Sequence, residues 1–311
     1  MTVARPAEHG PQFEAMMAQI DFKLTQDGVD IPSRPMLALR EVSLRYQLEM
    51  PLSGGDPARL PPNLRQNAAL SDAIDRWYKT NYGGRLKEDP CPARIVLLLD
   101  GDLYALRVPR IFGSVNFVVT RQWLDAPGIS RGPATANIVQ LIDGMTPAKA
   151  ARLSDAGLET IGSAFETVVL AAYTLEGTDH PLTAIALGDA GVAVEALMAR
   201  GGRYGDAKWA SLQVAEKVLK AAIDRAGAEP KPTHNLTALA NALTSTGLVF
   251  NASAQIAAIQ CSPGIRYGDE PCSRDEALAA QKAAYELINI LREAGANLAL
   301  SIGGLSRFED P

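Results

Sequence analysis

The stretch GGRYGDAKWASLQVAEKVLKAAIDRAGAEPKPTHNLTALANAL, residues 201–243, decides the fold of the C-terminal part of the chain. From Trp209 onward its apolar residues recur every three or four positions, which is the spacing of one buried helix face. Gly227 predicts the end of this helix, because glycine readily adopts the left-handed conformation that closes a helix. Two prolines follow and prevent continuation, so a second helix is expected to begin at His234 with Thr233 as its cap.

Further helices flank this stretch on both sides. An apolar run ends at Gly201-Gly202, and a capping box, Ser273-Arg-Asp-Glu276, opens the last helix. In that motif the serine and the glutamate satisfy each other's unpaired backbone N–H groups. The helices expected in this region are 182–200, 204–226, 234–243 and a last one from about residue 274.

The clearest strand signals lie between residues 93 and 120. Ile95–Leu99 is a short apolar run, Asp100-Gly101 predicts a tight turn, and Leu103–Val108 is a second run. Asp-Gly between two apolar runs is a strong hairpin signal. Val115–Thr120 could pair with this hairpin, so a small antiparallel sheet is expected.

Three segments nearer the N-terminus have weaker patterns. Apolar residues at helical spacing predict a short helix around Phe13–Ile20. Alternating apolar and polar residues predict a strand over Ala38–Met50. An amphipathic helix is expected at Asn67–Tyr82, where Gly83-Gly84 ends it.

The segment Ile138–Ile161 is expected to be a helical connector. Thr146 can cap a helix there and Gly157 can end it. The alternative is one half of a helix-hairpin-helix, whose turn offers backbone N–H groups to a phosphate.

The predicted fold class is α+β, a small antiparallel sheet with helices followed by an all-α up-down helical bundle. The expected parts are an N-terminal extension at 1–35, an α+β domain at 36–131, a helical connector at 132–177, a helical bundle at 178–300 and a tail at 301–311.

Composition restricts the classes of function. The chain has 311 residues, of which 47% are hydrophobic and 21% charged, as in a soluble globular protein. Its net charge of −5 argues against holding duplex nucleic acid through its overall charge. Three widely spaced cysteines form no CxxC pair, so no metal site is predicted, and no cofactor motif is found. With no signal-peptide pattern and no apolar run of about 18 residues, a cytoplasmic protein without membrane contact is expected.

The C-terminal region, from about residue 178 to 292, resembles a HEPN domain. The resemblance is carried by Tyr204 and Ala207 at a helix entry, by Thr233-His-Asn-Leu236 at the start of the next helix, by the Arg-Tyr-containing loop Ile265–Glu270, and by the final helix Ser273–Leu291. These motifs occur in the order and spacing of that family. The resemblance does not extend to residues 1–130.

The resemblance implies a small helical bundle, commonly dimeric, of a family with roles in toxin–antitoxin, antiphage and RNA-processing systems. Its ribonucleases use an Arg-x4–6-His motif, and this motif is not found here. Arg225 and His234 are separated by eight residues that include two prolines, and Arg266 has no histidine after it. The sequence therefore favours a protein without enzymatic activity, although catalysis is left open.

Six residues are candidates for a functional site, and each has a structural alternative. A displaced catalytic pair would use His234 as the base and Arg225 as the cation. RNA or a nucleotide would be bound by Lys217, Lys220, Arg266 and Tyr267. In the structural alternatives, the histidine contributes to a helix start or to packing, and Lys220 forms i,i+4 ion pairs with Glu216 and Asp224 on a solvated helix face. Tyr267 would then close the end of the bundle while Arg266 meets a helix C-terminus.

Two functions follow from these alternatives. The first is a non-catalytic HEPN-like binding or assembly protein, a homodimer that engages RNA, a nucleotide or a protein partner in a defence or toxin–antitoxin type system. The second is a metal-independent ribonuclease of the HEPN type with a displaced Arg/His site. An architectural subunit of a larger complex is a further alternative.

Overall fold

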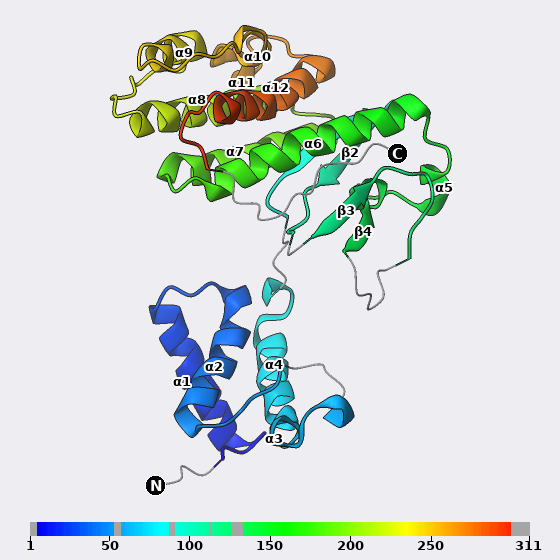
Figure 1. Ribbon diagram of the computed structural model, residues 1–311, viewed down its shortest axis with the longest axis vertical. Helices are drawn as coiled ribbons and strands as arrows, with labels where there is room; N and C mark the ends of the chain where they lie inside the picture. The colour runs from blue at the N-terminus through cyan, green and yellow to red at the C-terminus, as the bar shows by residue number, and fades with distance from the viewer. Residues whose placement is uncertain (1–4, 53–56, 87–90, 112–113, 126–132, 300–311) are drawn as a thin grey trace. The chain divides into compact units, whose positions relative to one another are not determined.

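The computed structural model describes residues 5–52, 57–86, 91–111, 114–125 and 133–299, and the chain forms two compact units, 1–89 and 90–311 (Figure 1). These units differ from the parts expected from the sequence. Residues 1–35 belong to the same unit as the segment that follows them, and the strands belong to the same unit as the helical bundle. The reason is that each unit has its own buried apolar core.

The first unit is helical. Its α-helices are α1 (Pro11–Gln26), α2 (Arg34–Tyr46), α3 (Pro62–Arg65) and α4 (Ala68–Tyr82), with 3-10 turns at Ile31–Ser33, Pro57–Arg59 and Gly83–Leu86. The expected helices around Phe13–Ile20 and at Asn67–Tyr82 are confirmed as α1 and α4. The core that joins α1, α2 and α4 contains Phe13, Met17, Ile20, Val42, Leu70, Ile74 and Tyr78.

The strand expected at Ala38–Met50 is wrong, because α2 occupies most of this segment. Pro35 lies in the first turn of the helix, where its missing N–H is not needed. Ala38 and Val42 are four positions apart and both are fully buried, which is the spacing of a helix face. Only two residues of this segment are buried, so the alternation of the remaining apolar residues misled the prediction.

In the part of the second unit that the structure describes, four short strands come first. β1 (Arg94–Leu99) and β2 (Asp102–Arg107) form the expected antiparallel hairpin. Asp100 and Gly101 have φ of 50° and 91°, as the two-residue turn requires. β3 (Val115–Val118) does not extend this hairpin; it pairs in parallel with β4 (Ala134–Asn137) in a separate two-stranded sheet.

The rest of the second unit is helical, so the α+β fold class is confirmed. After a 3-10 turn at Ile138–Leu141 the helices are α5 (Pro147–Ala150), α6 (Asp155–Gly177), α7 (Pro181–Met198), α8 (Tyr204–Arg225), α9 (Leu236–Thr244), α10 (Ser253–Ile259), α11 (Gly264–Tyr267) and α12 (Arg274–Glu293). Thr146 caps α5 as expected, whereas Gly157 lies in the first turn of α6 and does not end a helix.

Helix α8 is the centre of the bundle and positions the candidate site. It packs against α7, α9 and α12, and α12 also packs against α6 and β1. The apolar stripe expected from the sequence is confirmed, since Leu212, Ala215, Leu219 and Ile223 are fully buried. The side opposite this stripe is buried as well, at Val214, Val218 and Ala221, and the polar residues of α8 form a narrow strip between the two buried sides.

Candidate functional site

A buried carboxylate lies at the centre of the polar side of α8. Glu216 is 6% exposed, and its two oxygens have different partners. Oε1 lies 2.6 Å from the Nζ of Lys220, one turn further along α8. Oε2 lies 2.6 Å from the Nδ1 of His234, in the segment before α9. A carboxylate withdrawn from water needs such partners, because unpaired it would destabilise the folded state.

A second ion pair joins the same region to α7. Lys217 Nζ lies 2.6 Å from Asp189 Oδ2 on α7 and donates to Gln213 Oε1 at 3.1 Å. Gln213 Nε2 in turn donates to Glu216 Oε2 at 3.3 Å. We call the connected residues the α8 network: Asp189, Gln213, Glu216, Lys217, Lys220 and His234.

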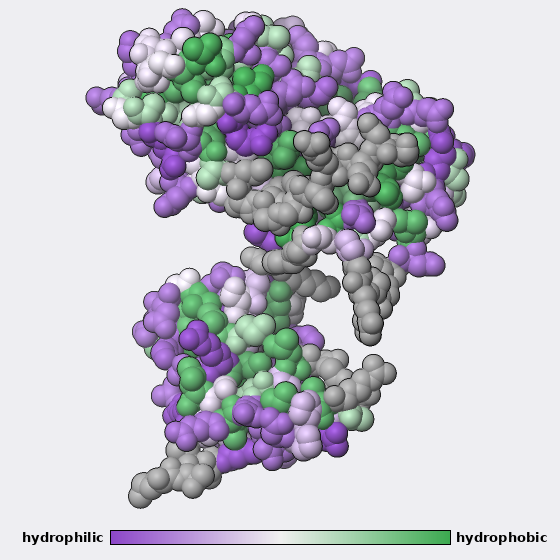
Figure 2. Space-filling view, in the orientation of Figure 1, coloured by the Kyte–Doolittle hydropathy of each residue, from purple (hydrophilic) through white to green (hydrophobic). Residues whose placement is uncertain are grey.

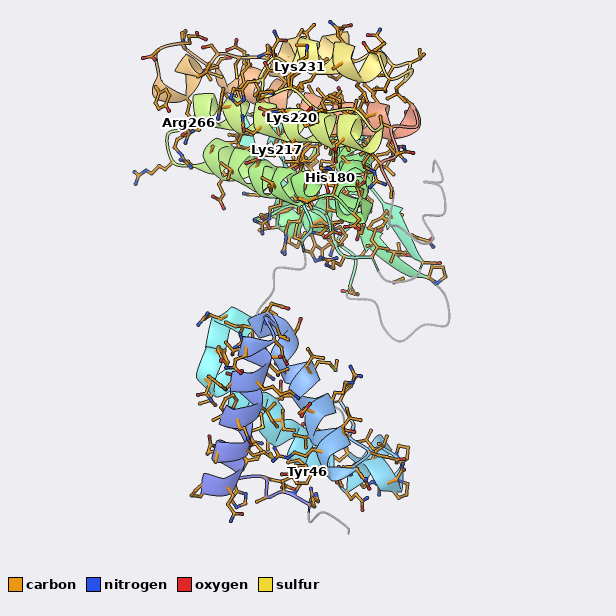
Figure 3. The ribbon with its side chains drawn as sticks, turned by 90° about the vertical axis from the view of Figure 1, so that its left-hand side faces the viewer. Tyr46, His180, Lys217, Lys220, Lys231 and Arg266 are labelled. Atoms are coloured by element: carbon orange, nitrogen blue, oxygen red, sulfur yellow. The ribbon has the colours of Figure 1, made fainter. Side chains whose placement is uncertain are left out.

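The α8 network is balanced in charge. It contains two carboxylates and two ammonium groups, so its net charge is zero while His234 is neutral. The side chains of Lys217 and Lys220 are only 16% and 18% exposed, and each is held by a carboxylate. Lys220 forms the expected i,i+4 ion pair with Glu216, whereas Lys217 pairs with Asp189 on α7, and the two lysines lie near each other (Figure 3).

His234 is the outward end of the α8 network. Its side chain is 57% exposed, and its ring lies 5.5 Å from the ring of Trp209, centroid to centroid. A carboxylate that accepts from Nδ1–H leaves the lone pair of Nε2 directed away from it. The arrangement can thus accept a hydrogen bond or a proton at Nε2, while Trp209 offers an aromatic surface beside it.

The cap of α9 differs from the prediction. Asn235, not Thr233, is the N-cap, and its side chain accepts from the N–H of Ala238. The hydroxyl of Thr233 accepts from the N–H of Asn235. These short bonds hold the segment that carries His234 at the entry of α9.

The structure does not bring Arg225 and His234 together as a catalytic pair. Arg225 donates from Nε to the carbonyl of Asn297 at 2.7 Å and from Nη1 to the carbonyl of Asp179 at 3.2 Å. It also lies nine residues after Glu216 on α8, which is about 13 Å along the helix axis. The guanidinium thus fastens two loops at the far end of the helix.

Arg266 and Tyr267 lie at the other end of α8. A Cβ on Gly205 would lie 2.2 Å from the carbonyl oxygen of Ile265, so this glycine allows α11 to pack closely against the first turn of α8. Tyr267 is 75% exposed and therefore does not close the bundle. The guanidinium of Arg266 lies 6.0 Å from the centre of that ring, away from Lys217 and Lys220 (Figure 3).

Sequence reasoning missed Asp189 and Gln213, and it did not predict the contact between Glu216 and His234. The available signal for Asp189 was a single charge in the apolar run Ala184–Val194. A lone carboxylate in such a run needs a partner from another helix. Its partner Lys217 could not be named, because the relative rotation of α7 and α8 is not encoded in either segment alone.

One other pocket in the second unit is less suited to an anionic ligand. A shallow pocket of about 390 Å³ lies between α9 and α10, where hydrophobic residues reach the surface (Figure 2). Its described lining includes Thr237, Asn241, Phe250, Asn251 and Gln260, and no charged side chain is among the described residues that form it. Within the described ranges no group of three or more His, Cys, Asp or Glu could hold a metal ion.

Comparison with known proteins supports the resemblance in the C-terminal region. The family model of the HEPN domain matches residues 193–294, from the second half of α7 to the end of α12. The match therefore contains five of the six residues of the α8 network, all but Asp189, and it leaves the N-terminal part without a family. No curated protein and no solved structure matches the chain.

Proposed function

We propose that the chain is a non-catalytic HEPN-type binding protein that engages RNA or a nucleotide at the exposed end of the α8 network. The observation that supports this most is the contact of His234 with the buried Glu216 beside Trp209. It fixes an imidazole next to an aromatic ring. Such a pair can stack on a nucleobase and hydrogen-bond to it.

The charges of the α8 network explain why binding is proposed in place of cleavage. Phosphodiester cleavage needs a cation at the developing charge as well as a base. Arg225 is held by two backbone carbonyls, and Lys217 and Lys220 are each held by a carboxylate. Because these cations already have partners, binding fits the α8 network better than cleavage does.

The second candidate function is RNA cleavage, and one observation favours it. A carboxylate on Nδ1 is the partner that orients a histidine used as a general base, and Glu216 lies 2.6 Å from the Nδ1 of His234. In this alternative Glu216 and His234 replace the expected Arg225–His234 pair, and a second copy of the chain supplies the cation.

Variants of the intact protein separate the two candidates. We expect wild-type protein to bind a labelled single-stranded RNA, followed by fluorescence anisotropy, and to leave it uncut on a denaturing gel. His234→Ala should weaken binding about tenfold, equivalent to about 1.4 kcal/mol. His9→Ala is the matched control, because His9 is exposed and lies in the first unit, outside the α8 network. Cleavage that is lost in His234→Ala but kept in His9→Ala would establish the second candidate.

The biological setting is proposed on the family resemblance and the composition alone. We place the protein in the cytoplasm, as a homodimer that acts in a defence or toxin–antitoxin type system, with RNA, a nucleotide or a protein as its partner. Arg266 and Tyr267 are proposed as a secondary contact with RNA, since the ring of Tyr267 is open to solvent.

A further inference from the structure

Helix α7 has two apolar faces, and only one of them is covered within the described part of the chain. Ala186, Ala190 and Ala193 are buried on the side towards the bundle. On the outer side Ile185, Val192 and Met198 are 50%, 49% and 42% exposed. We call the outer residues the α7 face: Ala184, Ile185, Gly188, Gly191, Val192, Glu195 and Met198.

Two glycines lie at the middle of the α7 face. A Cβ added at Gly188 or Gly191 would meet nothing within 4 Å. Glycine lowers the stability of a helix interior relative to alanine. Nothing within the described chain approaches these positions, so no internal packing explains the glycines. Close approach of another helix backbone does explain them, because glycine lets two helix axes come near each other.

The charges at the two ends of the helix indicate which partner fits. Asp179 precedes α7 and Arg200 follows it, and both are exposed. Neither side chain has a hydrogen-bond or ion-pair partner within the residues that the structure describes. In an antiparallel pair of α7 helices that cross between Gly188 and Gly191, these two residues are equally far from the crossing point. Asp179 of each copy would then lie opposite Arg200 of the other.

We propose that the α7 face is the surface where a second copy of this chain docks, antiparallel and crossing at the two glycines. This deepens the assembly part of the proposed function and is independent of RNA binding. Packing at about 20° keeps the two helices close along most of their length. The same symmetry places the Asp179–Arg200 contact at both ends of the interface.

A bilayer is the other apolar partner to consider. By length and composition alone, α7 could cross a membrane, and 39% of it is buried in the bundle. Asp189, near its middle, pairs with Lys217 of α8, and Glu195 lies on the outer face. Insertion would have to break that ion pair and carry both carboxylates into hydrocarbon. A second copy of the chain is therefore the better fit.

The test is the mass of the intact protein in solution, measured by sedimentation velocity over a wide range of concentrations. Wild type is expected to form a dimer. Gly188→Leu should weaken it about tenfold or more, while the melting temperature stays the same or rises because leucine favours the helix. Val192→Glu should have the same effect on the dimer. Val249→Glu is the matched control, since Val249 is 86% exposed and lies outside α7.

Charge reversal tests the orientation. Asp179→Arg and Arg200→Asp should each weaken the dimer, and the double variant should restore it. A monomer at every concentration, a dimer indifferent to Gly188→Leu, or binding of the wild type to neutral lipid vesicles would overturn the proposal. A double variant that fails to restore the dimer would overturn the antiparallel arrangement. RNA binding by a monomer would leave the proposed function standing and remove only this interface.

Discussion

At the scale of single residues, Glu216 holds the candidate site together. It accepts from Lys220, Gln213 and His234 while it is almost fully buried. The i,i+4 pair Glu216–Lys220 could be predicted from sequence, because both residues lie on one helix. The contact with His234 could not, because it depends on how the eight residues between Arg225 and His234 return along α8.

Loss of this carboxylate should destabilise the fold. In Glu216→Ala the ammonium of Lys220 and the imidazole of His234 lose their shared partner, so the free energy of unfolding should fall by about 2 kcal/mol. Urea denaturation followed by circular dichroism measures this. Glu229→Ala, an exposed glutamate in the loop after α8, is the control and should be neutral. Equal stability of the two variants would show that the α8 network is not a buried ion-pair network.

Cys261 should react slowly as a thiol. Burial raises the pKa of its thiol from 9.0 to about 11, so little thiolate is present at pH 8. Alkylation measured by mass spectrometry should be much slower in the folded protein than in urea. Because the pKa is higher in the folded state, the unfolded state loses this proton first. The free energy of unfolding should therefore decrease as the pH rises above about 9. Rapid alkylation of folded protein at pH 8 would contradict this account.

At the scale of elements, helices with explicit end signals were predicted well. The capping box of Ser273 and Glu276 opens α12, and Gly227 follows the end of α8. Prediction failed where contacts with distant parts of the chain, and not the local residue pattern, determine the secondary structure. Ala38–Met50 alternates as a strand does, and it became a helix because α1 and α4 bury its Ala38 and Val42. Likewise β3 has no local signal for its parallel partner β4.

The capping box gives a stability prediction for α12. Ser273→Ala removes the side chain that accepts from the Glu276 N–H, so the free energy of unfolding should fall by about 1 kcal/mol.

The hydrogen bonds from Ser273 lower the pKa of Glu276. Stability from this depressed pKa is present above the ordinary value of 4.5 and is lost as the pH falls below it. Between pH 6 and about pH 3 the free energy of unfolding, measured by urea denaturation, should therefore fall less in Glu276→Gln than in the wild type. An identical dependence on pH in the two proteins would contradict a stabilising role for the Glu276 carboxylate.

At the scale of the whole molecule, the HEPN-matched region shares a core with the β-hairpin. The N–H of Val96 on β1 donates to Gln281 of α12 at 2.9 Å, and the hydroxyl of Tyr285 donates to the carbonyl of Arg94 at 2.8 Å. Both side chains are almost completely buried. The domain boundary expected between residues 131 and 132 separates these hydrogen-bond partners. It was placed where the amino-acid composition changes, but the buried core continues across it.

A truncation experiment follows from this shared core. A fragment of residues 178–300 lacks β1, so the face of α12 that β1 covers is exposed and the Oε1 of Gln281 loses the N–H of Val96. This fragment should therefore unfold at a lower urea concentration than a fragment of residues 90–311. Circular dichroism during urea titration compares the two. Equal midpoints would show that the helical bundle folds by itself.

We propose that this protein binds RNA at the α8 network without cutting it. The most direct measurement incubates wild-type protein and His234→Ala with a mixed single-stranded RNA pool, and determines both the bound fraction and the lengths of the recovered RNA. We predict that the wild type binds the RNA more tightly than His234→Ala does, because His234 and Trp209 form the exposed end of the α8 network, and that both proteins leave the RNA at full length. RNA shortened by the wild type, and left intact by His234→Ala, would contradict the claim and identify a ribonuclease.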